Sequence, residues 1–262
     1  MSLCDRTALI FGASSGIGKS IALGLACKCS KIFLVSSNPQ KLTNTASYIS
    51  VNSSNSCIGT YAADMSNLDQ LNISIDRAID YLGHIDILIN NTGGPKIAPY
   101  SDLLVEDWDE VYKSLFLSAV IPTSRLCPLM SNYGWGRIIT ITSTVASEPS
   151  NLMILSASMR AGLTTYMKSL SRQVAPYGVT VNTVAPGGVQ TSRVVDLAEA
   201  RALKENIPVE KILSQNASAI PIGRLATPEE FAEYPLFLCD DSASYITGTC
   251  VNVDGGLTRS VF

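Results

Sequence analysis

Short apolar runs alternate with helix-length segments from one end of the chain to the other. The runs are rich in Val, Ile and Thr, and several are apolar at consecutive positions. Strands that are apolar on both faces are typical of a parallel sheet covered by helices on each side. The predicted strands are residues 7–11, 31–36, 58–63, 85–90, 137–143, 179–185 and 249–253. The alternation therefore predicts right-handed βαβ units and a doubly wound α/β fold of the Rossmann type, with a seven-stranded, mostly parallel sheet.

Helix-length segments fill the intervals between these runs. The predicted helices are residues 16–29, 39–50, 67–82, 108–132, 155–176 and 228–239. We see no linker, repeat or low-complexity tract, so one domain over residues 1–262 is expected. A long irregular stretch at about 188–226 contains helical segments near 193–205 and 208–219. We expect this stretch to form a mobile lid beside the site, the alternative being a surface excursion without function.

The composition argues against several classes of protein. The net charge is −3 and the Lys and Arg residues are scattered, which disfavours nucleic acid or an anionic membrane as a partner. Seven cysteines without C-x-x-C spacing and one histidine, His84, supply no metal site. No run approaches the roughly 20 apolar residues of a membrane helix, and the N-terminus lacks the pattern of a signal peptide. We therefore expect a cytoplasmic protein.

A glycine-rich loop joins the first predicted strand to the first predicted helix. Gly12, Gly16 and Gly18 have the spacing G-x-x-x-G-x-G. The first glycine would permit a tight turn, the second a close approach of the backbone to a pyrophosphate, and the third close packing of helix and sheet. The helix N-terminus would offer free N–H groups to phosphates. A tight turn without a ligand is the alternative.

This glycine spacing resembles that of the short-chain dehydrogenases/reductases, and further motifs extend the resemblance over essentially the whole chain. Asn90-Asn91-Thr92-Gly93 is similar to the family's Asn-Asn-Ala-Gly, and Ser143 ends a strand where the family has its catalytic serine. The segments IPIGR (220–224), TPEE (227–230) and VDGG (253–256) are similar to the family's C-terminal third.

The resemblance implies a dinucleotide cofactor. Asp64 would meet the adenine amino group, and the segment after Pro186 would grip the nicotinamide carboxamide. The implied cofactor-binding residues are Gly12, Ser14, Ser15, Gly16, Ile17, Gly18, Ser36, Ser37, Asp64, Met65, Asn91, Gly93, Pro186, Gly187, Val189 and Thr191.

The choice between NADP and NAD depends on the end of the second predicted strand. An acidic residue there would bond the ribose hydroxyls of NAD, and a basic residue would accept the extra phosphate of NADP. This chain has Ser36, Ser37 and Asn38 there, with Lys41 one turn later. Because no carboxylate would repel the phosphate, we expect a weak preference for NADP, with NAD as the alternative.

The family's Tyr-x-x-x-Lys pair, which supplies the proton, has no counterpart in this sequence. No tyrosine has a lysine four residues later, and the family's spacing from Ser143 places the pair on Ser156 and Arg160. A slip of one residue would place it on Leu155 and Met159 instead.

Three residues are candidate substitutes. Arg160 keeps a cation and could bond a ribose hydroxyl or a substrate anion, but it is a poor proton source. Ser156 is a weak acid. Glu148, in the loop after Ser143, could supply a proton, although a solvated charge is the simpler interpretation. The family's helix asparagine falls on Leu115, so only Ser143 of the four catalytic positions is retained.

We expect an NAD(P)-dependent oxidoreductase with an atypical site, acting on a small carbonyl or alcohol. The alternatives are a non-catalytic nucleotide-binding sensor or partner subunit, and a non-redox lyase or isomerase that uses Ser143 and Glu148. The predicted helices 108–132 and 155–176 carry few charges, which with the resemblance implies a homotetramer or homodimer. The C-terminal residues 254–262 would lie at a subunit contact.

Overall fold

One parallel sheet organises the computed structural model, which describes residues 3–53 and 57–261. Its seven strands lie in the order β3-β2-β1-β4-β5-β6-β7, and every adjacent pair is parallel. The strands are β1 (Thr7–Phe11), β2 (Lys31–Ser36), β3 (Cys57–Ala62), β4 (Ile87–Asn90), β5 (Gly136–Ile141), β6 (Val179–Pro186) and β7 (Cys250–Val253). The predicted Rossmann-type fold in one α/β domain is thus confirmed, and the sheet is entirely rather than mostly parallel.

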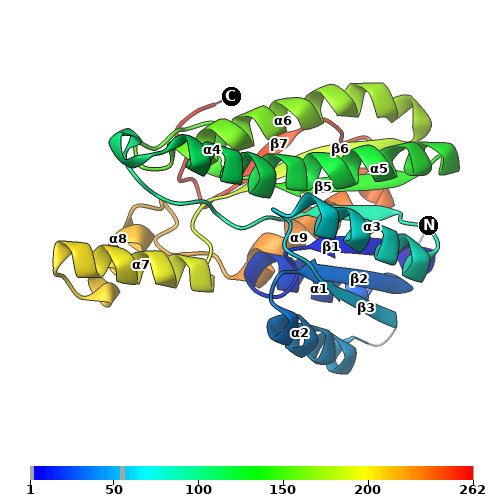
Figure 1. Ribbon diagram of the computed structural model, residues 1–262, viewed down its shortest axis with the longest axis horizontal. Helices are drawn as coiled ribbons and strands as arrows, with labels where there is room; N and C mark the ends of the chain where they lie inside the picture. The colour runs from blue at the N-terminus through cyan, green and yellow to red at the C-terminus, as the bar shows by residue number, and fades with distance from the viewer. Residues whose placement is uncertain (1–2, 54–56, 262) are drawn as a thin grey trace.

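Nine α-helices of the described residues connect or follow these strands (Figure 1). They are α1 (Gly16–Ala26), α2 (Pro39–Asn52), α3 (Leu68–Leu82), α4 (Val105–Val111), α5 (Ser118–Tyr133), α6 (Ile154–Val174), α7 (Ser192–Glu205), α8 (Val209–Ser218) and α9 (Pro228–Leu238). No helix among the described residues is both long enough and apolar enough to cross a membrane.

The predicted continuous helix over 108–132 is wrong in one respect. A π-helical stretch, Tyr112–Leu117, separates α4 from α5. The Ser118 hydroxyl donates to the carbonyl oxygen of Ser114 at 2.6 Å, an oxygen that a regular α-helix reserves for the backbone N–H of residue 118. This side-chain bond accompanies the change in helix type beside Leu115.

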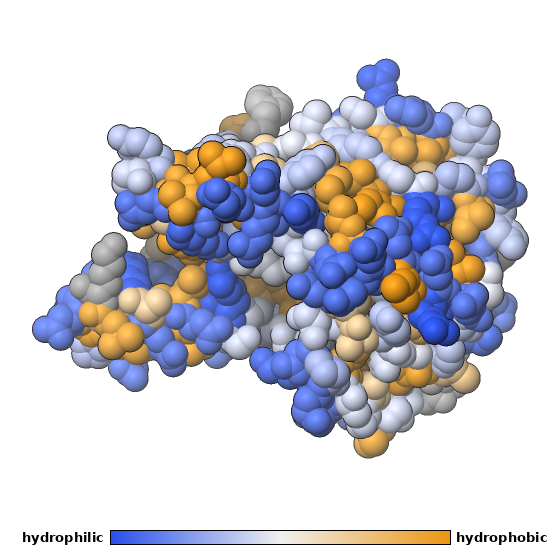
Figure 2. All heavy atoms as spheres, viewed as in Figure 1, coloured by the Kyte–Doolittle hydropathy of each residue, from blue (hydrophilic) through white to orange (hydrophobic). Residues whose placement is uncertain are grey.

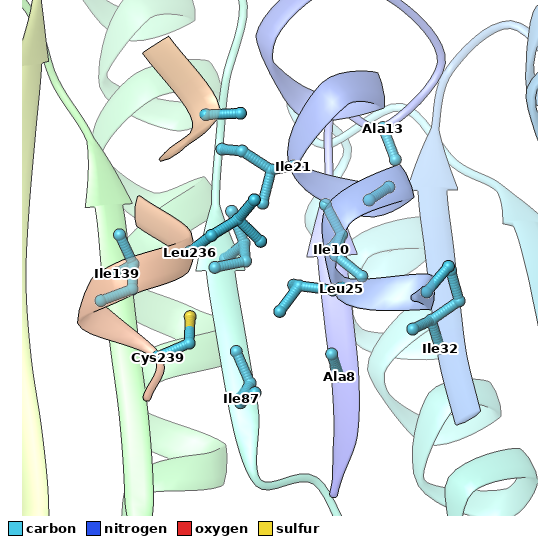
Figure 3. Packing of buried hydrophobic residues seen from close by; sticks show 14 of the residues in the cluster. Ala8, Ile10, Ala13, Ile21, Leu25, Ile32, Ile87, Ile139, Leu236 and Cys239 are labelled. Atoms are coloured by element: carbon cyan, nitrogen blue, oxygen red, sulfur yellow. The ribbon is translucent and has the colours of Figure 1, made fainter. Parts of the chain in front are cut away.

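Two apolar layers, one on each face, hold the sheet between its helices. On one face, α1, α2 and α9 supply residues such as Ile21, Leu42 and Phe231. On the other, α3, α5 and α6 supply residues such as Ile75 and Leu126. Figure 3 shows side chains of α1 and α9 converging on one face of the central strands. Because the second layer covers the opposite face, these strands are apolar at consecutive positions.

The segment 191–219, here called the α7–α8 arm, projects from the body at the left of Figure 1. Ala198, Ala202 and Ile212 form a small buried cluster between its two helices. The predicted helical segments of this region are therefore present, and its role as a lid stays a prediction.

We expect Ile21→Ala to lower the free energy of unfolding by about 2–5 kcal/mol, since the substitution leaves a cavity in a fully buried layer. Urea denaturation measures this change. The matched control is Ile73→Ala on α3, where the side chain is 43% exposed, with an expected change below about 1 kcal/mol. Equal losses in the two variants would contradict the assignment of Ile21 to the inner layer.

Candidate active site

A cavity of about 400 Å³ opens where the strands end, at the point where the sheet order reverses between β1 and β4. In open parallel sheets this switch point is the usual ligand site. The α7–α8 arm borders it, and a recess separates the arm from the upper part of the body (Figure 2). The predicted site residues that line the cavity are Gly12, Ser14, Ser15, Gly16, Ile17, Ser36, Ser37, Met65, Asn91, Gly93, Ser143, Ser156, Arg160, Pro186, Gly187 and Thr191.

The glycine loop packs directly against the end of β4. Gly12 has φ +62°, and a Cβ there would lie 2.4 Å from the carbonyl oxygen of Asn91. A Cβ on Gly18 would lie 2.1 Å from the carbonyl oxygen of Gly12, so α1 can approach the loop only with glycine at this position. Asn91 Nδ2 donates to the Gly12 carbonyl at 3.1 Å and joins the two segments.

The cavity fits a dinucleotide at this end. Ser15 is the N-cap of α1 but makes no side-chain hydrogen bond to the helix, so the first backbone N–H groups face the cavity without that cap. Such N–H groups bind phosphate oxygens. The hydroxyls of Ser14 and Ser36 lie 2.7 Å apart at the end of β2, and no carboxylate is among the cavity-lining residues.

Ser143 lies two residues beyond the end of β5. Its hydroxyl oxygen accepts a 3.4 Å hydrogen bond from the backbone N–H of Val145, which caps a short 3₁₀ turn over Thr144–Ala146. The strand and the turn together fix the hydroxyl at the cavity wall, where its own proton can be donated to a ligand.

Arg160 is buried on α6 and joins three segments of the site. Its Nη1 donates to the carbonyl oxygens of Ile141 and Thr142, at 3.0 and 2.7 Å. Its Nη2 donates to the carbonyl of Gly93 at 3.3 Å, and its Nε to the hydroxyl oxygen of Ser156 at 3.2 Å. Four of the five guanidinium N–H donors are thus used, which leaves one for a ligand.

Burial lowers the pKa of Arg160 to about 10, so the side chain remains a cation at neutral pH. Its partners are neutral oxygens. The Ser156 hydroxyl, in a side chain that is 2% exposed, accepts a hydrogen bond from this cation. It can therefore donate its own proton only to an acceptor other than Arg160. Ser143, Ser156 and Arg160, which the sequence grouped as catalytic candidates, therefore line one cavity.

Glu148 lies elsewhere. It does not line the cavity, and its Oε1 accepts from the backbone N–H groups of Arg259 and Ser260. These hydrogen bonds, that from Ser260 first, lower the pKa of the carboxyl, which makes it a poor proton source at neutral pH. The structure thus places Glu148 as an anchor of the C-terminal segment, contrary to its expected position beside the substrate.

Three of the implied cofactor residues also lie outside the cavity lining. Asp64 is exposed, and its Oδ1 accepts from the backbone and the hydroxyl of Ser66. Val189 is buried and bridges to Ala226. Gly18 lies behind the loop, against Gly12.

Sequence reasoning missed two cations at the cavity, Lys96 and Arg193. Lys96 follows the Asn-Asn-Thr-Gly-Gly-Pro run and forms a 3.0 Å ion pair with Asp107. Arg193 opens the arm, and its Nη2 donates to the carbonyl of Pro95 at 2.7 Å. Arg193 follows Thr191, an implied cofactor residue, by two positions, and this proximity in the sequence could have indicated that it lies at the cavity. No cluster of metal-ligating side chains occurs within residues 3–53 and 57–261.

The comparisons with known proteins identify the family. A family profile described as enoyl-(acyl carrier protein) reductase matches residues 12–258. NADPH-dependent reductase BacG of Bacillus subtilis is 32% identical over 99% of this chain and 100% of its own length. The 3-oxoacyl-[acyl-carrier-protein] reductase FabG of Aquifex aeolicus is 30% identical, over 98% and 99%.

Solved structures agree with these relatives. YwfH, an NADPH-dependent reductase involved in bacilysin biosynthesis, has a TM-score of 0.92 at 31% identity, covering 98% of this chain and 100% of that one. L-sorbose reductase from Gluconobacter frateurii, complexed with NADPH and L-sorbose, has a TM-score of 0.94 at 28% identity, covering 100% and 99%. The chain belongs to the short-chain dehydrogenase/reductase family, and the predicted enzyme class, an oxidoreductase, is confirmed.

We expect the stability that Glu148 contributes to be lost in acid. The folded-state pKa of this carboxyl is below its unfolded value, so the contribution is present above about pH 4.5 and disappears as the pH falls further. The melting temperatures of wild type and Glu148→Gln should therefore differ at pH 7 and converge toward pH 3. Glu110→Gln, on exposed α4 surface, is the control; a Glu148→Gln difference independent of pH would contradict the assignment.

Proposed function

We propose that the chain is an NADPH-dependent reductase of a small carbonyl compound, with an atypical set of proton-transfer groups. The observation that carries this proposal is the single cavity shared by the glycine loop and by Ser143, Ser156 and Arg160. Several similar proteins are NADPH-dependent reductases or bind NADPH, in agreement with the weak preference expected from Ser36 and Ser37. Bound NADPH supplies the hydride.

The chain's own residues would position the carbonyl and stabilise its oxygen. The Ser143 hydroxyl donates to that oxygen, and Arg160 provides positive charge in a buried setting where electrostatic stabilisation is strong. The remaining N–H of Arg160 is available to the cofactor ribose or to the substrate. We assign Ser156 and Arg160 to the family's tyrosine and lysine positions.

The proton would reach the oxygen from water through the Ser156 hydroxyl. Because Ser156 accepts from Arg160, it is oriented to donate away from the guanidinium. The Glu148 carboxylate is held by backbone N–H groups outside the cavity, which also disfavours a lyase or isomerase that uses it as a base. We expect the α7–α8 arm to act as the lid over this site.

Replacing Ser143 by alanine should lower kcat/KM for an activated carbonyl by about 10²- to 10³-fold, because one oxyanion donor is lost. The measurement is the decrease in NADPH absorbance. Ser147→Ala, a nearby serine that does not line the cavity, is the matched control. Tight NADPH binding without turnover on a broad carbonyl panel would instead favour the non-catalytic alternative.

Cofactor preference has its own test. Ser37 is exposed at the end of β2 and lines the cavity. We expect Ser37→Asp to weaken NADPH binding by roughly 10- to 100-fold through repulsion of the ribose phosphate, and to leave NADH binding unchanged or tighter. Cofactor fluorescence measures both, with Ser47→Asp, on exposed α2 surface outside the cavity, as the control. Equal weakening of both cofactors would contradict the proposed position of the phosphate.

The expected homotetramer or homodimer also belongs to this proposal. Leu129 and Tyr133 of α5 are 41% and 66% exposed, apolar surface that fits a subunit contact. Sedimentation velocity distinguishes the two assemblies from a monomer.

A further inference from the structure

Every charged side chain among the described residues that line the cavity is a cation. Lys96, Arg160 and Arg193 are among its residues, whereas none of the described residues that line it is Asp or Glu. The whole chain has the opposite balance, with a net charge of −3. A positive cavity in a negative chain favours an anionic ligand, because like-signed walls concentrate the field inside a cleft.

The three cations differ in how their charge is compensated. Lys96 is paired with the Asp107 carboxylate. Arg160 and Arg193 bond only to neutral oxygens in the part of the chain that the structure describes. For Arg160, which is 6% exposed, an uncompensated charge is costly, and an anion in the adjoining cavity would offset that cost.

Both arginines converge on the loop after β4. Arg160 donates to the Gly93 carbonyl, and Arg193 donates to the Pro95 carbonyl from the start of the arm. A Cβ on Gly94 would lie 3.3 Å from Nε and Nη2 of Arg193, so glycine leaves room for the guanidinium against this loop. Arg193 is exposed and makes one hydrogen bond to this loop, so its other N–H groups remain for a ligand.

The geometry points to a substrate that carries a carboxylate, which Arg193 binds directly and the positive charge of Arg160 attracts. We therefore propose that this chain reduces an oxo acid; the inference rests on the proposed reductase function and names its substrate class. The other anion within reach is the cofactor pyrophosphate, because Thr191, two residues before Arg193, lies against Gly16 of the glycine loop. The experiment separates these two sources.

The test compares oxo acids with their methyl esters as substrates of the whole protein at saturating NADPH. Three variants accompany wild type: Arg193→Gln, which removes the charge; Arg193→Lys, which keeps it; and Arg201→Gln. Arg201 lies on the same helix, is 47% exposed and pairs with Glu205, so it controls for a general loss of positive charge on the arm.

We expect wild type to prefer the acid through a lower KM. Arg193→Gln should lower that preference by about 10- to 100-fold, the loss of a charge-assisted bond, while Arg193→Lys retains most of it and Arg201→Gln all of it. The NADPH dissociation constant should stay the same in all three variants. The effect on KM rather than kcat separates ligand binding from a role in the chemistry.

Two results would overturn the proposal. The first is equal kcat/KM of wild type for acid and ester. The second is a loss of NADPH binding in Arg193→Gln as large as its loss of acid binding, which would assign the anion to the cofactor. If no substrate is turned over, isothermal titration calorimetry measures the binding of the same acids and esters to the complex of the protein with NADP⁺. Arg193-dependent binding of the acid without reduction would uphold the carboxylate site and contradict only the proposed reductase activity; no such binding would overturn the site itself.

Discussion

The arrangement of the active site depends on the hydrogen bonds that the buried guanidinium of Arg160 donates. It donates to carbonyl oxygens just before Ser143, to the loop after β4 and to Ser156 on its own helix. The elements it joins are far apart in the chain, and each contributes to the cavity wall. A lysine, with its single ammonium, offers three donors on one atom and could not span these oxygens as a planar fork does. Arg160 thus holds these segments together through hydrogen bonds and also places a positive charge at the cavity.

The sheet and the glycine loop were predictable because their signals are local. Strands buried on both faces show uninterrupted apolar runs, and the close approach of Gly18 to Gly12 admits no side chain. The same applies to the two helices of the arm, which the sequence indicated near 193–205 and 208–219.

The features that the sequence did not indicate are mostly contacts between distant residues. Glu148 accepts from backbone groups 111 and 112 positions later, and no sequence pattern announces such a partner. Arg193 reaches the Pro95 carbonyl across 98 positions, so its place at the cavity emerges only from folding. The change to π-helix at Tyr112–Leu117 is local, and it is accompanied by a hydrogen bond from the Ser118 hydroxyl to the Ser114 carbonyl. The cavity-lining residues of the glycine loop were thus easier to foresee than Arg193.

The small buried cluster between α7 and α8 has a consequence for how this protein can diversify. Ala198, Ala202 and Ile212 pack on one another and form a cluster separate from both apolar layers of the sheet. Substitutions along the outer faces of these helices can accumulate while the sheet and the glycine loop keep their geometry. The arm thus carries a core of its own, and changes on its surface need not disturb the layers that hold the sheet.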